Sequence, residues 1–187
     1  MITVTHKPVL DTPKPYFSLS AYDYLEYLSH YRNDLYSGNK GVYLSSQVTV
    51  DDQILYYPFI DIDGDNNVSG DARIESAILN AIITYKTLKL LNVSDRFTFI
   101  FTGKTGFRAV SNILVDKYAY LAFIDLIKGE MPHIIDTAPT ENYDMPQQII
   151  AYKGSKLHNH GELVNRHSSV VPKDLLYNEA ITVNTYK

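Results

Sequence analysis

The residues with the clearest chemical potential are three alternating aspartates, Asp61, Asp63 and Asp65, which follow the apolar run at residues 56–60. If residues 56–62 form a strand, its two-residue period places Asp61 and Asp63 on the same face. Carboxylates this close repel each other, and a bound cation normally keeps such a pair ionised. Because the donors are all oxygens, the expected cation is Mg²⁺, Mn²⁺ or Ca²⁺.

Composition predicts a single globular unit. The 187 residues suffice for one domain with a core, and 45% hydrophobic with 20% charged residues argues against disorder. The net charge of -4 argues against strong unaided binding of nucleic acid, although a local basic groove can still contact phosphates. The lack of cysteine excludes disulfides and thiolate zinc sites. No segment resembles a membrane span or a signal peptide, so we expect a cytoplasmic protein without a membrane partner.

Hydrophobic periodicity predicts the elements that precede the aspartates. Residues 1–15 contain three prolines, which prevent a regular helix, and are predicted to form an irregular arm. Residues 18–36 have helical spacing, with Ser18 or Ser20 as the cap. Two strands joined by a turn are predicted next, and this hairpin would deliver the aspartates at its end. The strands are residues 41–50 and 53–62, and the turn is Asp51-Asp52.

Helices and strands alternate after the aspartates. Residues 71–91 show the best helical periodicity in the chain, and residues 116–128 predict a second amphipathic helix. Four shorter apolar segments are predicted strands, at residues 97–101, 107–110, 134–136 and 147–152. The predicted fold class is therefore α+β.

Several short motifs occur in a recognisable order along the chain. They are Asp61-Ile62-Asp63, a long helix, Thr102-Gly103-Lys104-Thr105-Gly106-Phe107-Arg108, Ile135-Asp136, and Gly154-Ser155-Lys156-Leu157-His158. In order and spacing they resemble the catalytic core of the archaeo-eukaryotic primase superfamily. This superfamily includes primase small subunits, plasmid and phage primase-polymerases, and the polymerase domain of bacterial end-joining ligases.

The resemblance implies a fold and a division of the chain. The expected fold is an RRM-like antiparallel or mixed sheet flanked by helices, with a smaller amino-terminal α/β lobe. After the arm at residues 1–15, residues 16–187 would form one primase-polymerase core. Its parts would be an amino-terminal lobe at 16–55, a metal-binding catalytic lobe at 56–172 and a tail at 173–187.

The resemblance also implies an activity, namely template-directed nucleotidyl transfer in DNA replication. The substrates would be nucleoside triphosphates and a single-stranded DNA template, and a helicase or an accessory primase subunit could be a partner. The implied ligands of two Mg²⁺ or Mn²⁺ ions, which are also the catalytic residues, are Asp61, Asp63 and Asp136. Asp144 competes with Asp136 for the role of third ligand.

A second set of residues would bind the nucleotide. Close backbone approach at the glycines and positive charge at the lysines and arginine suit a phosphate. The implied residues are Thr102, Gly103, Lys104, Gly106, Arg108, Lys153, Ser155 and His158. The superfamily usually has histidine at the position of Arg108, and Lys153 stands in for an arginine that the superfamily has before Gly154. Arginine can contact a phosphate through two hydrogen bonds.

Two other functions remain open from the sequence. One is a nucleotide-binding or DNA-binding replication accessory protein that is weakly active or inactive, which the departure at Arg108 favours. The other is a Ca²⁺-binding interaction module that uses the Asp61–Asp71 loop, whose opening Asp-x-Asp-Gly-Asp resembles an EF-hand. Ala72 stands where that motif requires its closing acid, so the loop departs from the pattern.

Overall fold

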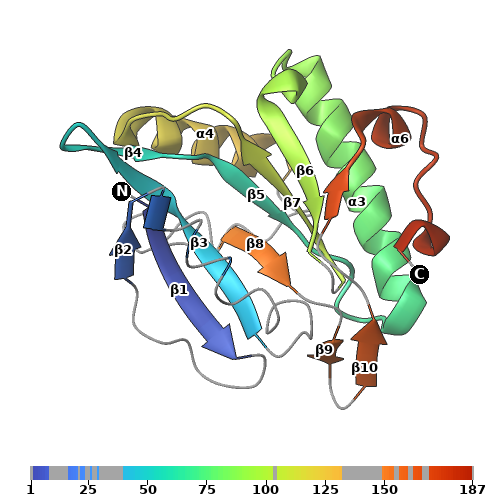
Figure 1. Cartoon of the computed structure of the whole chain (residues 1–187). Helices are drawn as coiled ribbons and strands as arrows, with labels where there is room; N and C mark the ends of the chain where they lie inside the picture. Colours follow the sequence, from blue (N-terminus) through green and yellow to red (C-terminus); the bar gives the residue numbers. More distant parts are fainter. Residues whose placement is uncertain are drawn as a thin grey trace.

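The computed structural model describes residues 2–8, 17–20, 22–23, 26, 29, 40–102, 105–131, 149–153, 156–159, 162–165 and 169–186. These residues form an α+β fold with two antiparallel sheets, a separate two-stranded hairpin and helices (Figure 1). The α+β prediction is confirmed. Among the described helices, none combines the length and apolar character needed to cross a membrane.

The first sheet contains strands from both halves of the chain. Its strands are β1 (Ile2–Pro8), β2 (Phe17–Leu19), β3 (Lys40–Val50), β4 (Gln53–Tyr56) and β8 (Ile149–Lys153). Their order is β2-β1-β3-β4, and β8 also pairs with β3. The prediction of an irregular arm at residues 1–15 is therefore wrong for Ile2–Pro8. Prolines exclude a helix interior, but Pro8 sits at the end of the strand, where an extended backbone accepts it.

The helix predicted at residues 18–36 begins later than expected, because Phe17–Leu19 pairs with β1 as a strand. Ser20 is the cap: its Oγ accepts a hydrogen bond from the Asp23 backbone N at 3.1 Å and donates one to Asp23 Oδ2 at 2.7 Å. Tyr22, Asp23, Glu26 and Ser29 are helical, and the rest of this prediction lies outside the described residues.

The predicted hairpin turns at Asp51 and Asp52, which have φ of 47° and 62°. Two positive φ values fit the tight turn whose twist matches that of the flanking strands. The continuous second strand predicted at 53–62 is wrong, because it breaks at Tyr57 and Pro58. Proline donates no ladder hydrogen bond, and here its carbonyl accepts one from the Ser111 backbone N at 2.7 Å. The aspartates consequently belong to a different sheet from β4.

The second sheet has the order β11-β6-β7-β5, and all its neighbours are antiparallel. Its strands are β5 (Phe59–Ile62), β6 (Phe97–Phe101), β7 (Phe107–Ser111) and β11 (Ser169–Val171). The strands predicted at 97–101 and 107–110 are confirmed. Alternate residues such as Ile60, Phe99 and Ala109 are fully buried, and they form the main core together with α3.

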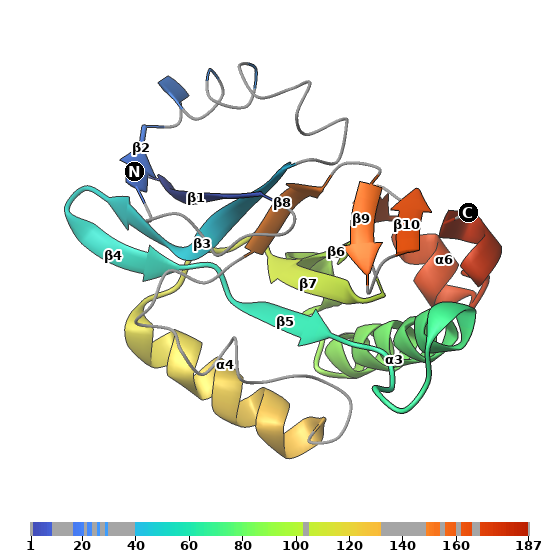
Figure 2. The same cartoon turned by 90° about the horizontal axis from the view of Figure 1, so that it is seen from below.

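Two helices cover this buried face, while strands β1, β3 and β8 of the first sheet lie on the other side of the second sheet (Figure 2). Strand β4 of the first sheet instead packs on α4, where Tyr56 stacks on Tyr120. Helix α3 (Gly70–Leu90) and helix α4 (Lys117–Glu130) confirm the predicted helices within one or two residues. Asp116 caps α4 by accepting a hydrogen bond from the Ala119 backbone N at 2.8 Å. Because the helices pack on one face of the second sheet, Asp61 lies on the opposite face.

Residues 173–187 were predicted to be a tail, but the described part is an integral layer of the core. Helix α6 (Lys173–Tyr177) and the 3₁₀ turn η2 (Val183–Tyr186) place Leu176, Ile181 and Val183 among the buried residues beside α3. The apolar pattern here is too short and irregular for periodicity to reveal it. The remaining described elements are the 3₁₀ turn η1 (Ser94–Arg96) and the hairpin of β9 (Lys156–Asn159) with β10 (Glu162–Asn165).

Candidate active site

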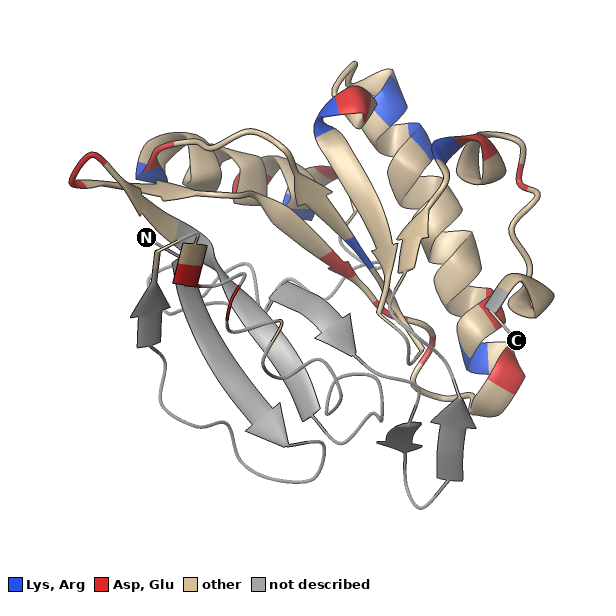
Figure 3. Cartoon of the chain, in the orientation of Figure 1, with Lys and Arg blue, Asp and Glu red and all other residues tan. Residues whose placement is uncertain are grey.

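Asp61, in β5, and Asp63, directly after it, lie on the face of the second sheet that points away from α3. Ile60 and Ile62 are fully buried against the helices, whereas Asp61 between them is only partly buried. Gly64 faces α3 again, because a Cβ built on it would lie 2.0 Å from the Arg73 carbonyl oxygen. Asp61 and Asp63 therefore alternate with residues on the helix side, as the sequence predicted. The end of β5 is acidic, and a basic position lies next to it on β7 (Figure 3).

Asp61 forms an ion pair with Arg108, its register partner on β7. Arg108 Nε donates to Asp61 Oδ1 at 2.8 Å and Nη2 donates to Oδ2 at 3.3 Å. The side chains are only 13% and 11% exposed for Asp61 and Arg108, respectively. The guanidinium carbon also lies 5.8 Å from the ring centroid of Phe59, which is buried on the same face. A two-pronged, largely desolvated pair of this kind fixes both side chains.

Gly106 lies against the second aspartate. A Cβ at Gly106 would come within 2.7 Å of Asp63 Oδ1 and 2.9 Å of the Ile62 carbonyl oxygen. The Gly106 carbonyl accepts hydrogen bonds from both the backbone N and the Oγ1 of buried Thr102, each at 3.0 Å. Thr102 thus closes the turn that the sequence assigned to nucleotide binding, and Gly106 makes room for a carboxylate.

Helix α3 holds the loop that follows β5. Asn80 Nδ2 donates to the Asp63 carbonyl at 2.8 Å. The Asp65 backbone N donates to Ser76 Oγ at 2.7 Å, and Ser76 Oγ donates to the Arg73 carbonyl at 2.9 Å. Sequence reasoning missed these supports. The available signal is a polar stripe on α3 at helical spacing, namely Arg73, Ser76, Asn80 and Thr84, running beside the apolar one.

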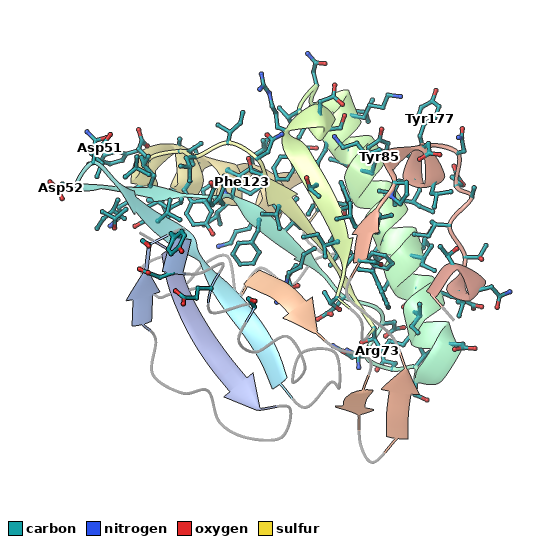
Figure 4. The ribbon with its side chains drawn as sticks, viewed as in Figure 1. Asp51, Asp52, Arg73, Tyr85, Phe123 and Tyr177 are labelled. Carbon is teal, nitrogen blue, oxygen red and sulfur yellow. The ribbon has the colours of Figure 1, made fainter. Side chains whose placement is uncertain are left out.

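Arg73 is the second arginine near the aspartates. Its side chain extends from the amino-terminal end of α3 beside the loop after β5 (Figure 4). Nη2 donates to Asn66 Oδ1 at 2.5 Å, while Nε is buried without a hydrogen-bond partner. Arg73 therefore packs over Gly64 and adds positive charge to a loop that carries Asp63 and Asp65.

Asp65 is engaged within its own loop. Its Oδ1 accepts hydrogen bonds from the backbone N and the Nδ2 of Asn67, both at 2.8 Å, which is an Asx-type turn. Within the part of the chain that the structure describes, which includes Asp61 through Asp71, no three acidic or histidine side chains form a group suited to a metal ion.

Several predicted site residues cannot be placed relative to the aspartates. Asp136, its competitor Asp144, Gly103, Lys104 and Ser155 lie outside the described residues. The backbone of Lys153 ends β8 opposite Gly41 of the first sheet, and that of His158 lies in β9 opposite Leu163; their side chains also lie outside the description. The described site therefore brings together Asp61, Asp63, Gly106 and Arg108.

A cavity of about 190 Å³ lies on the helix side of the second sheet, away from Asp61. Apolar side chains from α3, α4 and β6 line it, among them Leu88, Phe97, Phe123 and Ile127. Asp61, Asp63, Gly106 and Arg108 are not among its lining residues, so this cavity is separate from the acidic site.

Comparisons of this chain with protein-family models, with curated protein sequences and with solved structures found no match.

Proposed function

We propose that the chain is a template-directed nucleotidyltransferase of the archaeo-eukaryotic primase type, acting on nucleoside triphosphates and single-stranded DNA. The observation that carries the proposal is the pairing of β5 with β7. It sets two aspartates on one sheet face, with a glycine against Asp63 and an arginine against Asp61. Strand β7 also lies between β5 and β6, which α3 connects, as in a split β-α-β unit, and this arrangement is compatible with an RRM-like lobe.

The proposed reaction joins a primer to a nucleotide. The 3′-hydroxyl oxygen forms a bond to the α-phosphorus, the bond from that phosphorus to the bridging oxygen breaks, and pyrophosphate leaves with the electron pair. The hydroxyl proton passes to water. Asp61 and Asp63 have the hard oxygen donors that Mg²⁺ and Mn²⁺ prefer, and Asp136 is the proposed third ligand. Two such ions, when bound, supply charge stabilisation for the attacking and leaving oxygens.

The protein's own groups would position the substrates. Arg108 supplies a planar cation that can hold two phosphate oxygens at once, and its strand is central in the sheet. Asn80 fixes the backbone on which Asp63 is mounted, since its amide bonds the Asp63 carbonyl. The glycine at 106 lets the Asp63 carboxylate lie over β7 without a steric clash.

Primer synthesis and extension test the proposal directly. The assay uses a single-stranded template with labelled ribo- or deoxynucleotides, with or without a primer, in Mg²⁺ or Mn²⁺. Asp61→Asn and Asp63→Asn should each abolish product while leaving the circular dichroism spectrum intact. Asp65→Asn is the matched control: this exposed aspartate sits in the same loop and bonds Asn67. Wild-type product levels in both site variants would refute the assignment.

A second candidate is a nucleotide-binding or DNA-binding replication accessory protein without catalysis. Arg108 favours it, because both oxygens of Asp61 already accept hydrogen bonds from the guanidinium. This function predicts that purified protein binds nucleotide or oligonucleotide but incorporates none with either metal. The same assay, combined with equilibrium binding, therefore separates the two candidates.

A further inference from the structure

The cavity on the helix side of the second sheet has the walls of a ligand pocket. All but three of its lining residues are apolar. Phe123 reaches from α4 to the sheet, where its ring stacks on that of Phe97 with centroids 5.6 Å apart (Figure 4). An engineered apolar cavity of about 150 Å³ stays dry and binds benzene. At about 190 Å³, the cavity described here can hold an apolar group the size of a six-membered ring.

This cavity extends from the core to the surface. Leu126 and Ile113 in its lining are 42% and 37% exposed, whereas Phe97 and Met131 are only 4% and 2% exposed. Its inner end therefore lies in the core, and its outer end reaches solvent. A ligand can enter without unfolding the protein, and its apolar part is then removed from water.

The three polar lining residues are Arg96, Ser111 and Glu130. Ser111 is engaged, because its Oγ accepts a hydrogen bond from the Ile113 backbone N at 3.1 Å and donates one to the Ile113 carbonyl at 3.2 Å. Arg96 and Glu130 are exposed, and neither forms an ion pair within the part of the chain that the structure describes. The cavity thus presents one cation and one anion to a ligand.

Local structure holds these two charges in place. The Arg96 backbone N donates to the Val93 carbonyl at 2.9 Å, and the Asn112 backbone N donates to the Arg96 carbonyl at 2.7 Å. Glu130 is the last residue of α4, where the helix end carries a negative partial charge. That end disfavours the carboxylate by itself, but the two together attract an ammonium group.

We propose that this cavity binds a free α-amino acid with a large apolar side chain, such as phenylalanine or leucine. The ligand side chain fills the apolar part, its carboxylate pairs with Arg96, and its ammonium group pairs with Glu130. A purely apolar molecule would use neither charge, and a singly charged one would use only one of them. The cavity is separate from the acidic site, so the inference does not depend on the proposed function.

Isothermal titration calorimetry of the full chain tests whether both ends of the ligand are recognised. Phenylalanine should bind about tenfold more tightly than phenylethylamine, which lacks the carboxylate, because about one charged hydrogen bond is lost. It should exceed hydrocinnamate, which lacks the ammonium group, by about the same factor for the same reason. Leucine should also bind.

Two variants assign each charge to its partner on the ligand. Arg96→Gln should weaken phenylalanine binding about tenfold without weakening phenylethylamine binding, because that ligand has no carboxylate. Glu130→Gln should likewise weaken the binding of phenylalanine but not that of hydrocinnamate. Glu75→Gln is the matched control, since Glu75 is exposed on α3 and does not line the cavity. It should bind phenylalanine like wild type.

A third variant tests the location of the ligand. Ala119 lines the cavity from α4 and is exposed, so Ala119→Leu can fill the space without displacing a buried side chain. It should abolish binding of phenylalanine. Ala122→Leu makes the same change at an exposed position of α4 outside the lining, and it should bind like wild type. Leucine is a good helix former, so both variants should keep the circular dichroism spectrum of wild type.

The absence of binding heat with both phenylalanine and leucine would overturn the proposal. Equal affinity for phenylalanine and its two singly charged analogues would also overturn it, because the charges would then contribute nothing. Phenylalanine binding that survives Ala119→Leu would put the ligand elsewhere and have the same consequence. If Ala119→Leu does not fold, the variants at exposed Arg96 and Glu130 decide, and wild-type phenylalanine affinity in both would refute the site.

Discussion

The carboxylate of Asp63 lies directly over the Cα of Gly106, leaving no room for a side chain at that position. A Cβ there would approach Asp63 Oδ1 to 2.7 Å and the Ile62 carbonyl oxygen to 2.9 Å. The carbonyl belongs to the strand backbone and cannot swing aside as a side chain can. The close packing of the end of β5 against the start of β7 therefore requires glycine at position 106.

Gly106→Ala should therefore lower the free energy of unfolding by about 1–3 kcal/mol, the usual effect of overpacking. It should also reduce primer extension, because Asp63 must shift. Gly129→Ala is the control: an added Cβ meets nothing within 4 Å in α4. Alanine favours a helix, so this variant should gain about 0.4–1 kcal/mol in urea denaturation. Equal stability of the two variants would contradict the close contact.

The Asp61–Arg108 pair should show strong energetic coupling. A double-mutant cycle with Asp61→Asn and Arg108→Gln, measured by urea denaturation, should give a coupling free energy of about 1–3 kcal/mol, because both charges are mostly desolvated. The exposed pair of Lys86 and Glu179, with side chains 51% and 58% exposed, serves as control and should give about 0–1 kcal/mol. Coupling near zero in the first cycle would argue against the pair in solution.

Asn80, on α3, should contribute to the stability of the protein and to the position of Asp63. Asn80→Ala removes the hydrogen bond to the Asp63 carbonyl and should reduce stability by about 0.5–1.5 kcal/mol. If Asp63 binds metal, the variant should also weaken Mn²⁺ binding. Leu79→Ala, at the adjacent and 57% exposed position, should change neither quantity appreciably. Thermal denaturation and Mn²⁺ titration of both variants make the comparison.

The carboxyl-terminal segment should contribute to global stability. Leu176→Ala deletes a fully buried side chain and should reduce the free energy of unfolding by about 2–5 kcal/mol. Tyr177→Phe is the control, because the ring is 56% exposed and keeps its contact with Lys89. A small effect of Leu176→Ala in chemical denaturation would show that α6 detaches from α3.

Sequence reasoning succeeded where one element generates its own pattern. The helix at 70–90, the helix at 117–130 and the strands at 97–101 and 107–111 follow from periodicity, and the alternation around Asp61 follows from strand geometry. All of these depend on residues close together in the chain. The same holds for the Ser20 cap and the turn at Asp51 and Asp52.

Prediction failed where distant segments decide the structure. The strand at 2–8 is recognisable only through its pairing with β3, and the break at Pro58 only through the second sheet. The sequence identified Arg108 as a basic residue of the site, but its register opposite Asp61 depends on how two strands far apart in the chain align. The roles of Asp136, Lys104 and His158 remain predictions.

The pairing of β8 with β3 has a consequence for how the protein is made. Gly41–Leu44 pairs with residues that follow the whole β5-to-α4 segment in the chain. During synthesis on the ribosome, the first sheet therefore stays incomplete until residue 153 has emerged. The second sheet likewise lacks β11 until residue 171 has emerged. Long-range pairings of this kind slow folding. Both sheets should consequently form late and together, and a chain cut between α4 and β8 should complete neither.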